Sequence, residues 1–199
     1  MKYLSALLLL LLTALPAQAA PRVLLFDGYY LDMPRAKVQR RAEAQPCRTP
    51  GLEEHLCLRQ ATVYGGQKWQ QAFMFSGDQL KMIVLQRPFS PAGFRDAVRE
   101  ITGSDFVLAE INAGGNTFDA LAAARKGERN FQRSLEDFER RAAGARQLTY
   151  SFLDKRSMRA ARKAATLRDF LRQAPTGTRG VTLSHNGRLM LLTFLAPGA

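Results

Sequence analysis

Both cysteines of the chain and one of its two histidines lie in a single short stretch, "PCRTPGLEEHLC", at residues 46–57. Residues of these types can bind zinc, form a redox-active dithiol, or supply a thiolate nucleophile with histidine as its base. Zinc-binding cysteines usually stand about two to four residues apart, and a redox dithiol usually has the spacing C-x-x-C. Cys47 and Cys57 fit neither pattern, because nine residues separate them.

The start of the chain indicates the compartment in which this pair works. Lys2 is followed by the apolar run "LSALLLLLLTAL" and then by the small residues "AQA" at 17–19. This order is typical of a bacterial signal peptide that is cleaved after Ala19. An uncleaved anchor is the alternative, but a membrane-spanning helix needs about 20 apolar residues, and no later segment has that length either. We expect a periplasmic protein, or alternatively a secreted one, without a transmembrane segment in the mature chain.

An oxidising compartment favours joining the only two cysteines to each other. Pro46, Pro50 and Gly51 allow the segment between them to turn back. We therefore predict a structural disulfide between Cys47 and Cys57, with free thiols, a metal site and a nucleophile as the alternatives. His55 stands only two residues from Cys57, which gives no geometric support to a thiol–imidazole pair. We predict no metal and no cofactor.

The chain is strongly basic, with 29 Lys and Arg against 17 Asp and Glu and a formal net charge of +12. Nucleic acid is the usual partner of such a chain. Export argues against nucleic acid and leaves anionic lipid, acidic glycan or an acidic face of an envelope protein as the available partners. The alternative is that the charge only keeps the surface solvated.

Residues 20–88 have the pattern of a disulfide-containing half made of a strand, a helix and a meander of strands. "RVLLF" at 22–26 predicts a strand, and "MPRAKVQRRAEA" at 33–44 predicts a short helix with Pro34 in its first turn. "RQATVY" at 59–64 alternates as a strand. Apolar runs at 69–75 and 80–86 then flank the turn residues "SGDQ", which predicts a hairpin.

Residues 89–199 predict a half with two long amphipathic helices and a C-terminal hairpin. Ser90 and Pro91 are the expected cap and first residue of a helix that ends at Gly103. A strand is expected at 105–112 and another at 148–153. One long helix is expected from near Asn116 to residue 142, and the second from Lys155 to Gln173. Asn186–Gly187 predicts the turn of a hairpin over 180–195.

These elements predict an α+β fold with mainly antiparallel sheet, hairpins, and helices packed on one face. The segments "LKMIVLQRP" at 80–88 and "LMLLTFLAP" at 189–197 are both apolar strands that end in proline. Their similarity suggests two related halves that meet near residue 88, and chance is the alternative.

The helix expected from Lys155 to Gln173 is the best candidate binding surface. It carries seven basic residues and a single acid, Asp169, between Lys155 and Arg172. Its apolar stripe lies on the side away from the basic residues. The residues expected to bind an anionic partner are Arg156, Arg159, Arg162, Lys163 and Arg172. A solvated helix face without a binding role is the alternative.

Other patterns favour chemistry less. "NAGGNT" at 112–117 could present backbone N–H groups to an anion, but it lacks the lysine of a P-loop. We expect Asn116 to cap the following helix instead. The chain has no G-x-S-x-G motif for a serine hydrolase. No pair of carboxylates can be assigned as general acid and base from the sequence, so no catalytic residue is predicted.

The segment "GYYLDMPRAKV" at 28–38 resembles the start of periplasmic modules of the SmpA/OmlA and β-lactamase-inhibitor-protein type, over residues 22–87. This chain departs from that pattern in having no lipoprotein cysteine, and in having Pro34 where Ser or Thr is usual. The resemblance implies a binding or assembly role without catalysis. Together these patterns predict an exported, non-enzymatic binding protein that docks an acidic partner, with an envelope-polymer hydrolase as the alternative.

Overall fold

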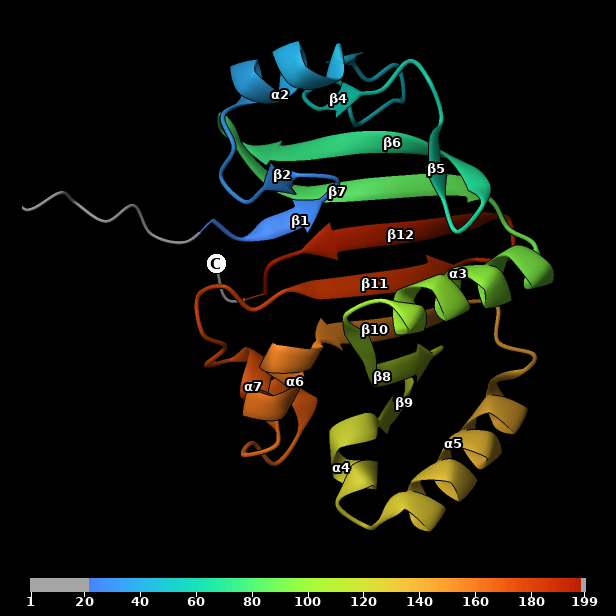
Figure 1. Ribbon diagram of the computed structural model, residues 1–199. Helices are drawn as coiled ribbons and strands as arrows, with labels where there is room; N and C mark the ends of the chain where they lie inside the picture. Colours follow the sequence, from blue (N-terminus) through green and yellow to red (C-terminus); the bar gives the residue numbers. More distant parts are fainter. Residues whose placement is uncertain (1–21, 198–199) are drawn as a thin grey trace, which may run out of the picture.

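The computed structural model describes residues 22–197 (Figure 1). The expected signal peptide and its cleavage site after Ala19 lie outside the described residues. No helix in the described part of the chain is both long and apolar enough to cross a membrane.

Ten strands form one sheet in which all the pairings are antiparallel (Figure 1). Nine of them lie in the order β3 (Gln45–Pro46), β4 (Leu56–Cys57), β6 (Gln67–Ser76), β7 (Gln79–Pro88), β12 (Leu189–Leu195), β11 (Gly180–His185), β10 (Leu148–Asp154), β8 (Phe106–Ala113) and β9 (Asn116–Asp119). The tenth, β5 (Thr62–Tyr64), pairs with β6. A separate two-stranded sheet is formed by β1 (Leu24–Phe26) and β2 (Tyr29–Tyr30). The predicted class, α+β with mainly antiparallel sheet, is confirmed.

The hairpins and the first helices form where the sequence predicts them. Gly77 and Gly187 both have positive φ, 55° and 83°, at the turns of the β6–β7 and β11–β12 hairpins. Ser90 caps α3 (Pro91–Gly103), because its hydroxyl accepts a hydrogen bond from Gly93 N at 3.1 Å. The short helix after Pro34 is α2 (Arg35–Ala42).

The first long helix of the prediction is wrong, because three elements take its place. Asn116 begins strand β9 instead of capping a helix, and the cap is Asp119, whose carboxylate accepts from Ala122 N at 2.9 Å. The helix α4 (Ala120–Ala124) then ends, and α5 (Glu128–Ala142) begins after Gly127, whose φ is 90°. Gly114 and Gly115 form the turn between β8 and β9, so "NAGGNT" connects two strands and does not precede a helix.

The prediction of a second long helix is also wrong, because two short helices lie in its place. These are α6 (Lys155–Ala161) and α7 (Leu167–Leu171). The hydroxyl of Thr166 accepts a hydrogen bond from Asp169 N at 3.1 Å and donates one to the Asp169 carboxylate at 2.8 Å. This local cap competes with a continuous helix and starts a new one.

The order of elements is repeated on the two sides of the central pair, β7 and β12. From the centre outward, one side has β7, β6, β4 and β3, and the other has β12, β11, β10 and β8. In the chain, β3 follows helix α2 and β8 follows helix α3. The two similar apolar segments at 80–88 and 189–197 contain these central strands, which pair along their length.

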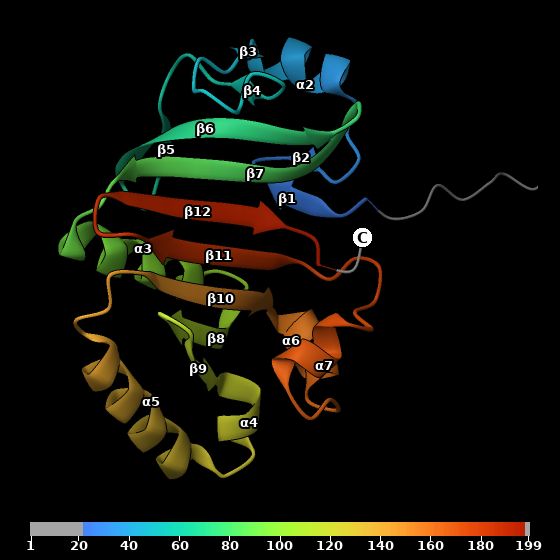
Figure 2. The same ribbon diagram turned by 180° about the vertical axis from the view of Figure 1, so that it is seen from behind.

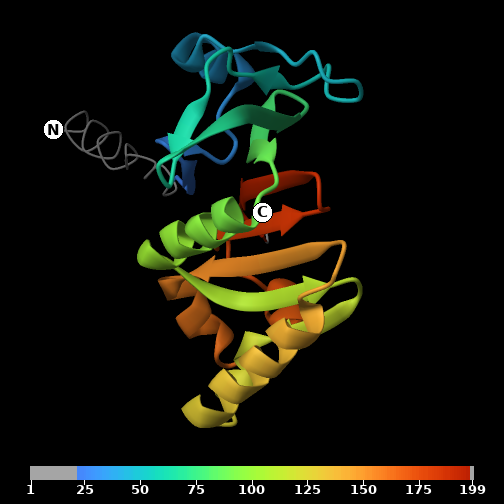
Figure 3. The same ribbon diagram turned by 90° about the vertical axis from the view of Figure 1, so that its right-hand side faces the viewer.

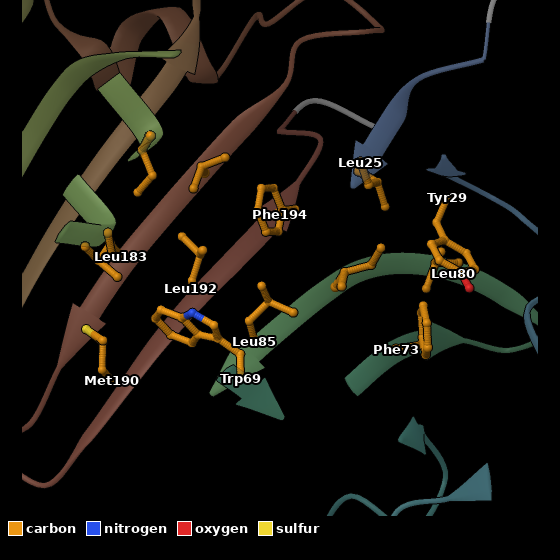
Figure 4. Packing of buried hydrophobic residues seen from close by; sticks show 14 of the residues in the cluster. Leu25, Tyr29, Trp69, Phe73, Leu80, Leu85, Leu183, Met190, Leu192 and Phe194 are labelled. Carbon is orange, nitrogen blue, oxygen red and sulfur yellow. The ribbon is translucent and has the colours of Figure 1, made fainter. Parts of the chain in front are cut away.

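The main core lies on one face of this sheet (Figure 4). Leu85 and Leu192 oppose each other on the central strands, and both are fully buried. Helices α2 and α3 and the β1–β2 hairpin contribute Val38, Ile101 and Tyr29 to the same cluster. Figure 3 shows the molecule from the side, with α3 lying along the sheet.

The opposite face is covered only at one end. Leu153 of β10 packs there against Ala161, Leu167 and Phe170 of α6 and α7. Over β6, β7, β12 and β11 no helix of the described residues lies in front of the sheet when it is seen from behind (Figure 2). Met82 and Leu189 point to this open face and are 37% and 44% exposed.

Cys47 and Cys57 form the predicted disulfide, with their Cα atoms 4.9 Å apart. His55 holds the loop between them against the sheet, because its Nδ1 accepts a hydrogen bond from Phe75 N at 3.2 Å and its carbonyl accepts one from Cys47 N at 3.0 Å. The bond joins β4 to the segment that follows the edge strand β3 and so closes the loop at this end of the sheet.

We predict that the double substitution Cys47→Ser with Cys57→Ser lowers the free energy of unfolding by about 2–3 kcal/mol, because the unfolded chain regains loop entropy. Urea unfolding of the mature protein measures this, and reductant added to the wild type is the matched control. Maleimide should label neither cysteine of the folded wild type without reductant. Rapid labelling without reductant, or equal stability of the variant, would contradict this role.

Candidate functional site

Asp154, the last residue of β10, fixes where α6 begins. One carboxylate oxygen accepts hydrogen bonds from Arg156 N and Ser157 N at 3.0 and 2.9 Å. The other accepts from the Ser157 hydroxyl at 2.7 Å and from Arg179 N at 3.0 Å. Burial acts to raise the pKa of Asp154, but the hydrogen bonds from Ser157 and the N–H and charge of Arg179 outweigh it, so the pKa is lowered. Asp154 therefore stays ionised and acts as a structural cap.

Asp119 has a similar role at the start of α7. One of its oxygens caps α4, and the other accepts a hydrogen bond from Leu167 N at 2.9 Å. A single carboxylate thus joins two helices that are distant in the sequence. With both oxygens bound to N–H groups, Asp119 holds the helices that surround the basic residues.

The predicted binding residues do not all lie together. Arg156 and Arg159 line one cavity of about 440 Å³, together with Lys155, Arg179, Asp105, Asp154 and Gly177. Arg162 and Arg159 line a second cavity, described below. Lys163 is exposed after the end of α6. Arg172 lines a different cavity, beside Glu110, and forms an ion pair with Asp169 at 2.9 Å.

The second cavity has a volume of about 730 Å³ and lies between β8, α4, α5 and α6. Its cationic residues are Arg125, Lys155, Arg159 and Arg162. The other lining residues are all apolar, and they include Val107, Leu108, Leu121, Phe131 and Met158. Lys155 and Arg159 line both cavities, so the two adjoin at α6.

The cationic side chains around α6 differ in how many hydrogen bonds and ion pairs they already form within the protein. Arg125 donates to the carbonyl oxygens of Arg162 and Ala164. Lys155 donates to Ser104 O at 3.0 Å and approaches the Asp105 carboxylate at 3.8 Å. Among the described residues, Arg156, Arg159 and Arg162 form no ion pair through their side chains. These three keep their hydrogen-bond donors available for a ligand.

We call this set of cations the α6 basic surface: Arg125, Lys155, Arg156, Arg159, Arg162 and Arg179. Sequence reasoning missed Arg125 and Arg179, because they follow α4 and precede β11 and share no helical spacing with α6. No local pattern could have found them, since only the cap formed by Asp154 and the tertiary contacts of Arg125 bring them to α6.

The third cavity lies at the edge of the open sheet face. It is lined by Glu110, a carboxylate whose raised pKa would suit a general acid. Glu110 of β8 is half-buried there with Arg168 and Arg172. Its pKa is raised by burial and by the negative charge of Asp119, and the charge of Arg168 opposes the shift. Because Asp119 is committed to two helix starts, Glu110 has no free carboxylate partner on the neighbouring strand β9.

The histidines have structural surroundings. His185 is stacked on Phe89 with ring centroids 4.0 Å apart, and burial lowers its pKa. His55 accepts a backbone hydrogen bond, as described above. In the described range 22–197, no group of three or more His, Cys, Asp or Glu residues is placed to hold a metal ion.

Comparison of the chain with protein-family models, curated proteins and solved structures finds no match. Function must therefore be inferred from the chemistry of the site itself.

We predict that Asp154→Asn lowers the free energy of unfolding at pH 7 by about 2 kcal/mol, because the NH2 group that replaces one carboxylate oxygen cannot accept the bonds from the Ser157 hydroxyl and Arg179 N. The lowered pKa means that the wild-type advantage is present above the usual Asp pKa of about 3.9 and is lost as the pH falls through the lower folded value. Urea unfolding between pH 7 and pH 2.5 measures the free energy of unfolding of the wild type and of Asp154→Asn.

The matched control is Asp105→Asn, since that side chain is 79% exposed and makes only the 3.8 Å contact with Lys155. It should change stability by less than about 0.5 kcal/mol. A stability gap between wild type and Asp154→Asn that stays constant to pH 2.5 would show that the carboxylate charge is not what stabilises the start of α6.

Proposed function

We propose that this protein is an exported, non-enzymatic binding protein of the bacterial envelope that docks an anionic partner on the α6 basic surface. The observation that carries the proposal is the gathering of six cations from three chain segments around two adjoining cavities. Asp105 and Asp154 are the only acids in their linings, and Asp154 is occupied as a helix cap.

Arginine suits this role because its planar guanidinium donates paired hydrogen bonds to a carboxylate or phosphate. Arg156, Arg159 and Arg162 follow one another at helical spacing on and just after α6, and all three are exposed. The formal net charge, which is +12 for the full chain and falls by one with the loss of Lys2 on cleavage, would add long-range attraction that raises the rate of encounter with a polyanion. The envelope address rests on the N-terminal signal pattern, and it makes an acidic protein face, an anionic lipid or an acidic glycan the partner class.

The alternative is an envelope-polymer hydrolase, and Glu110 is the specific observation in its favour. A half-buried carboxyl with a raised pKa can act as a general acid. Glycoside hydrolysis usually needs a second carboxylate as base or nucleophile. Asp119, the nearest candidate on the paired strand, is already bound to two backbone N–H groups. The geometry therefore favours binding over hydrolysis.

We predict that replacing Arg156, Arg159 and Arg162 together by Gln weakens binding to a model polyanion by about tenfold or more at 0.1 M salt. Retention of the mature protein on immobilised heparin, an acidic glycan, measures this as the salt concentration needed for elution. The wild-type protein should elute at clearly higher salt than the variant, since the lost interactions are electrostatic.

The control removes the same charge elsewhere, by replacing Arg129, Arg133 and Arg141 of α5, which are also exposed, with Gln. If only net charge matters, the two triple variants will elute together, and the proposed docking surface is wrong. Thermal unfolding of both variants confirms that each is folded before elution is compared.

A further inference from the structure

The cavity beside α6 lies along the first part of strand β8. Strand β9 pairs with β8 only over Glu110–Ala113, and the chain then turns into α4. The first part of β8, Phe106–Ala109, therefore has β10 on one side and, within residues 22–197, no strand on the other. A cavity of about 730 Å³ lies beside this part of β8 and is lined by its residues Val107 and Leu108.

The lining of this cavity has two chemically distinct parts. Seven of its residues are apolar, and they come from β8, α4, α5 and α6. The remaining four are Arg125, Lys155, Arg159 and Arg162. No acid and no neutral polar side chain lines it. A volume of this size with mostly apolar walls and a few convergent charged groups is typical of a small-molecule site.

We propose that this cavity binds a single-chain anionic amphiphile, with its alkyl or acyl chain against the apolar walls and its phosphate or carboxylate head group on Arg159 and Arg162. The assignment rests on the proposed function, because it names the ligand class that the α6 basic surface would hold. A chain without polar groups suits walls that offer no polar side chain. A negative head group suits a lining that has four cations and, among the described residues, no acid.

Partly exposed apolar side chains at the cavity support this occupant. Leu108, Phe131 and Met158 are neither buried nor fully exposed, and each lines the cavity. Burying them against an alkyl chain removes apolar surface from water. The head group would meet Arg159 and Arg162, which have no ion pair with any described residue, whereas Arg125 is held by two carbonyl oxygens.

The test is a calorimetric titration of the mature wild-type protein with butyl, octyl and dodecyl phosphate, each below its aggregation concentration. It measures the affinity for each compound. Affinity should rise by roughly fourfold for each methylene that enters the cavity. Inorganic phosphate should bind far more weakly than dodecyl phosphate, and dodecyltrimethylammonium should show no saturable binding. Lauric acid tests whether a carboxylate head serves as well as a phosphate.

Two variants test whether the alkyl phosphate binds in this cavity and not elsewhere on the protein. Ala124→Trp should fill the cavity from the end of α4, where Ala124 is exposed, and weaken dodecyl phosphate by at least about tenfold. Arg159→Gln should weaken it by about tenfold through the head group. Arg133→Gln, on the exposed part of α5 and outside the cavity lining, is the control and should change nothing.

An affinity that does not rise with chain length would overturn the proposal, and this result needs no variant. So would unchanged binding by a folded Ala124→Trp protein. The heparin experiment tests the docking surface independently of the amphiphile. Ala124→Trp leaves every cation in place, so this variant should elute from heparin at the same salt concentration as the wild type. Loss of heparin binding by the triple arginine variant, with a flat chain-length series, would uphold the docking surface and reject the amphiphile.

Discussion

The antiparallel pairing of β7 with β12 is the interaction on which the rest of the structure depends. Each strand is the last of its half of the chain, and each would be an edge strand with an apolar face if its half stood alone. Their pairing joins the halves into one sheet and places Ile83 opposite Phe194 and Leu85 opposite Leu192. All four side chains are buried, so the centre of the core is built by residues from both halves of the chain.

The candidate site follows from what happens at the far end of that sheet. There the regular strands end with β8 and the short β9, and the chain forms four helices around them. Asp119 and Asp154 hold three of these helices by accepting hydrogen bonds from their first N–H groups. Because the two carboxylates are committed to backbone groups, they do not form ion pairs with the nearby arginines. The side chains of Arg156, Arg159 and Arg162 form no ion pair with any described residue, so their donors stay available to a ligand.

Local signals in the sequence predicted much of the fold. Ser90 with Pro91, and Asn186 with Gly187, act within a few residues, and the structure has the helix start and the hairpin turn that they predict. The disulfide could be predicted from the cysteine count together with the export that the N-terminal pattern predicts. The two long helices could not be divided correctly, because apolar spacing continues through both breaks. One break depends on the bond from Leu167 N to Asp119, which is 48 residues away in the sequence.

The candidate site was predictable only in part, for the same reason. Arg156, Arg159 and Arg162 are near one another in the sequence and remain near one another, on α6 and just after its end. Arg172 was grouped with them through a continuous helix, but α7 places it with Glu110 and Asp169. Arg125 and Arg179 join the surface through tertiary contacts alone. Neither periodicity nor charge density along the chain contains that information.

The division of α6 from α7 also separates two kinds of surface. The α6 basic surface is rich in cations, whereas the open face of the sheet exposes Met82 and Leu189 on its central strands. Salt weakens contacts of the first kind by screening and does not weaken apolar contacts of the second kind. Arg172, beside the open face, is already paired with Asp169 and contributes less free charge there. For the anionic ligand that we propose, charge therefore favours α6 over the open sheet face, where a partner would have to be held mainly by apolar burial.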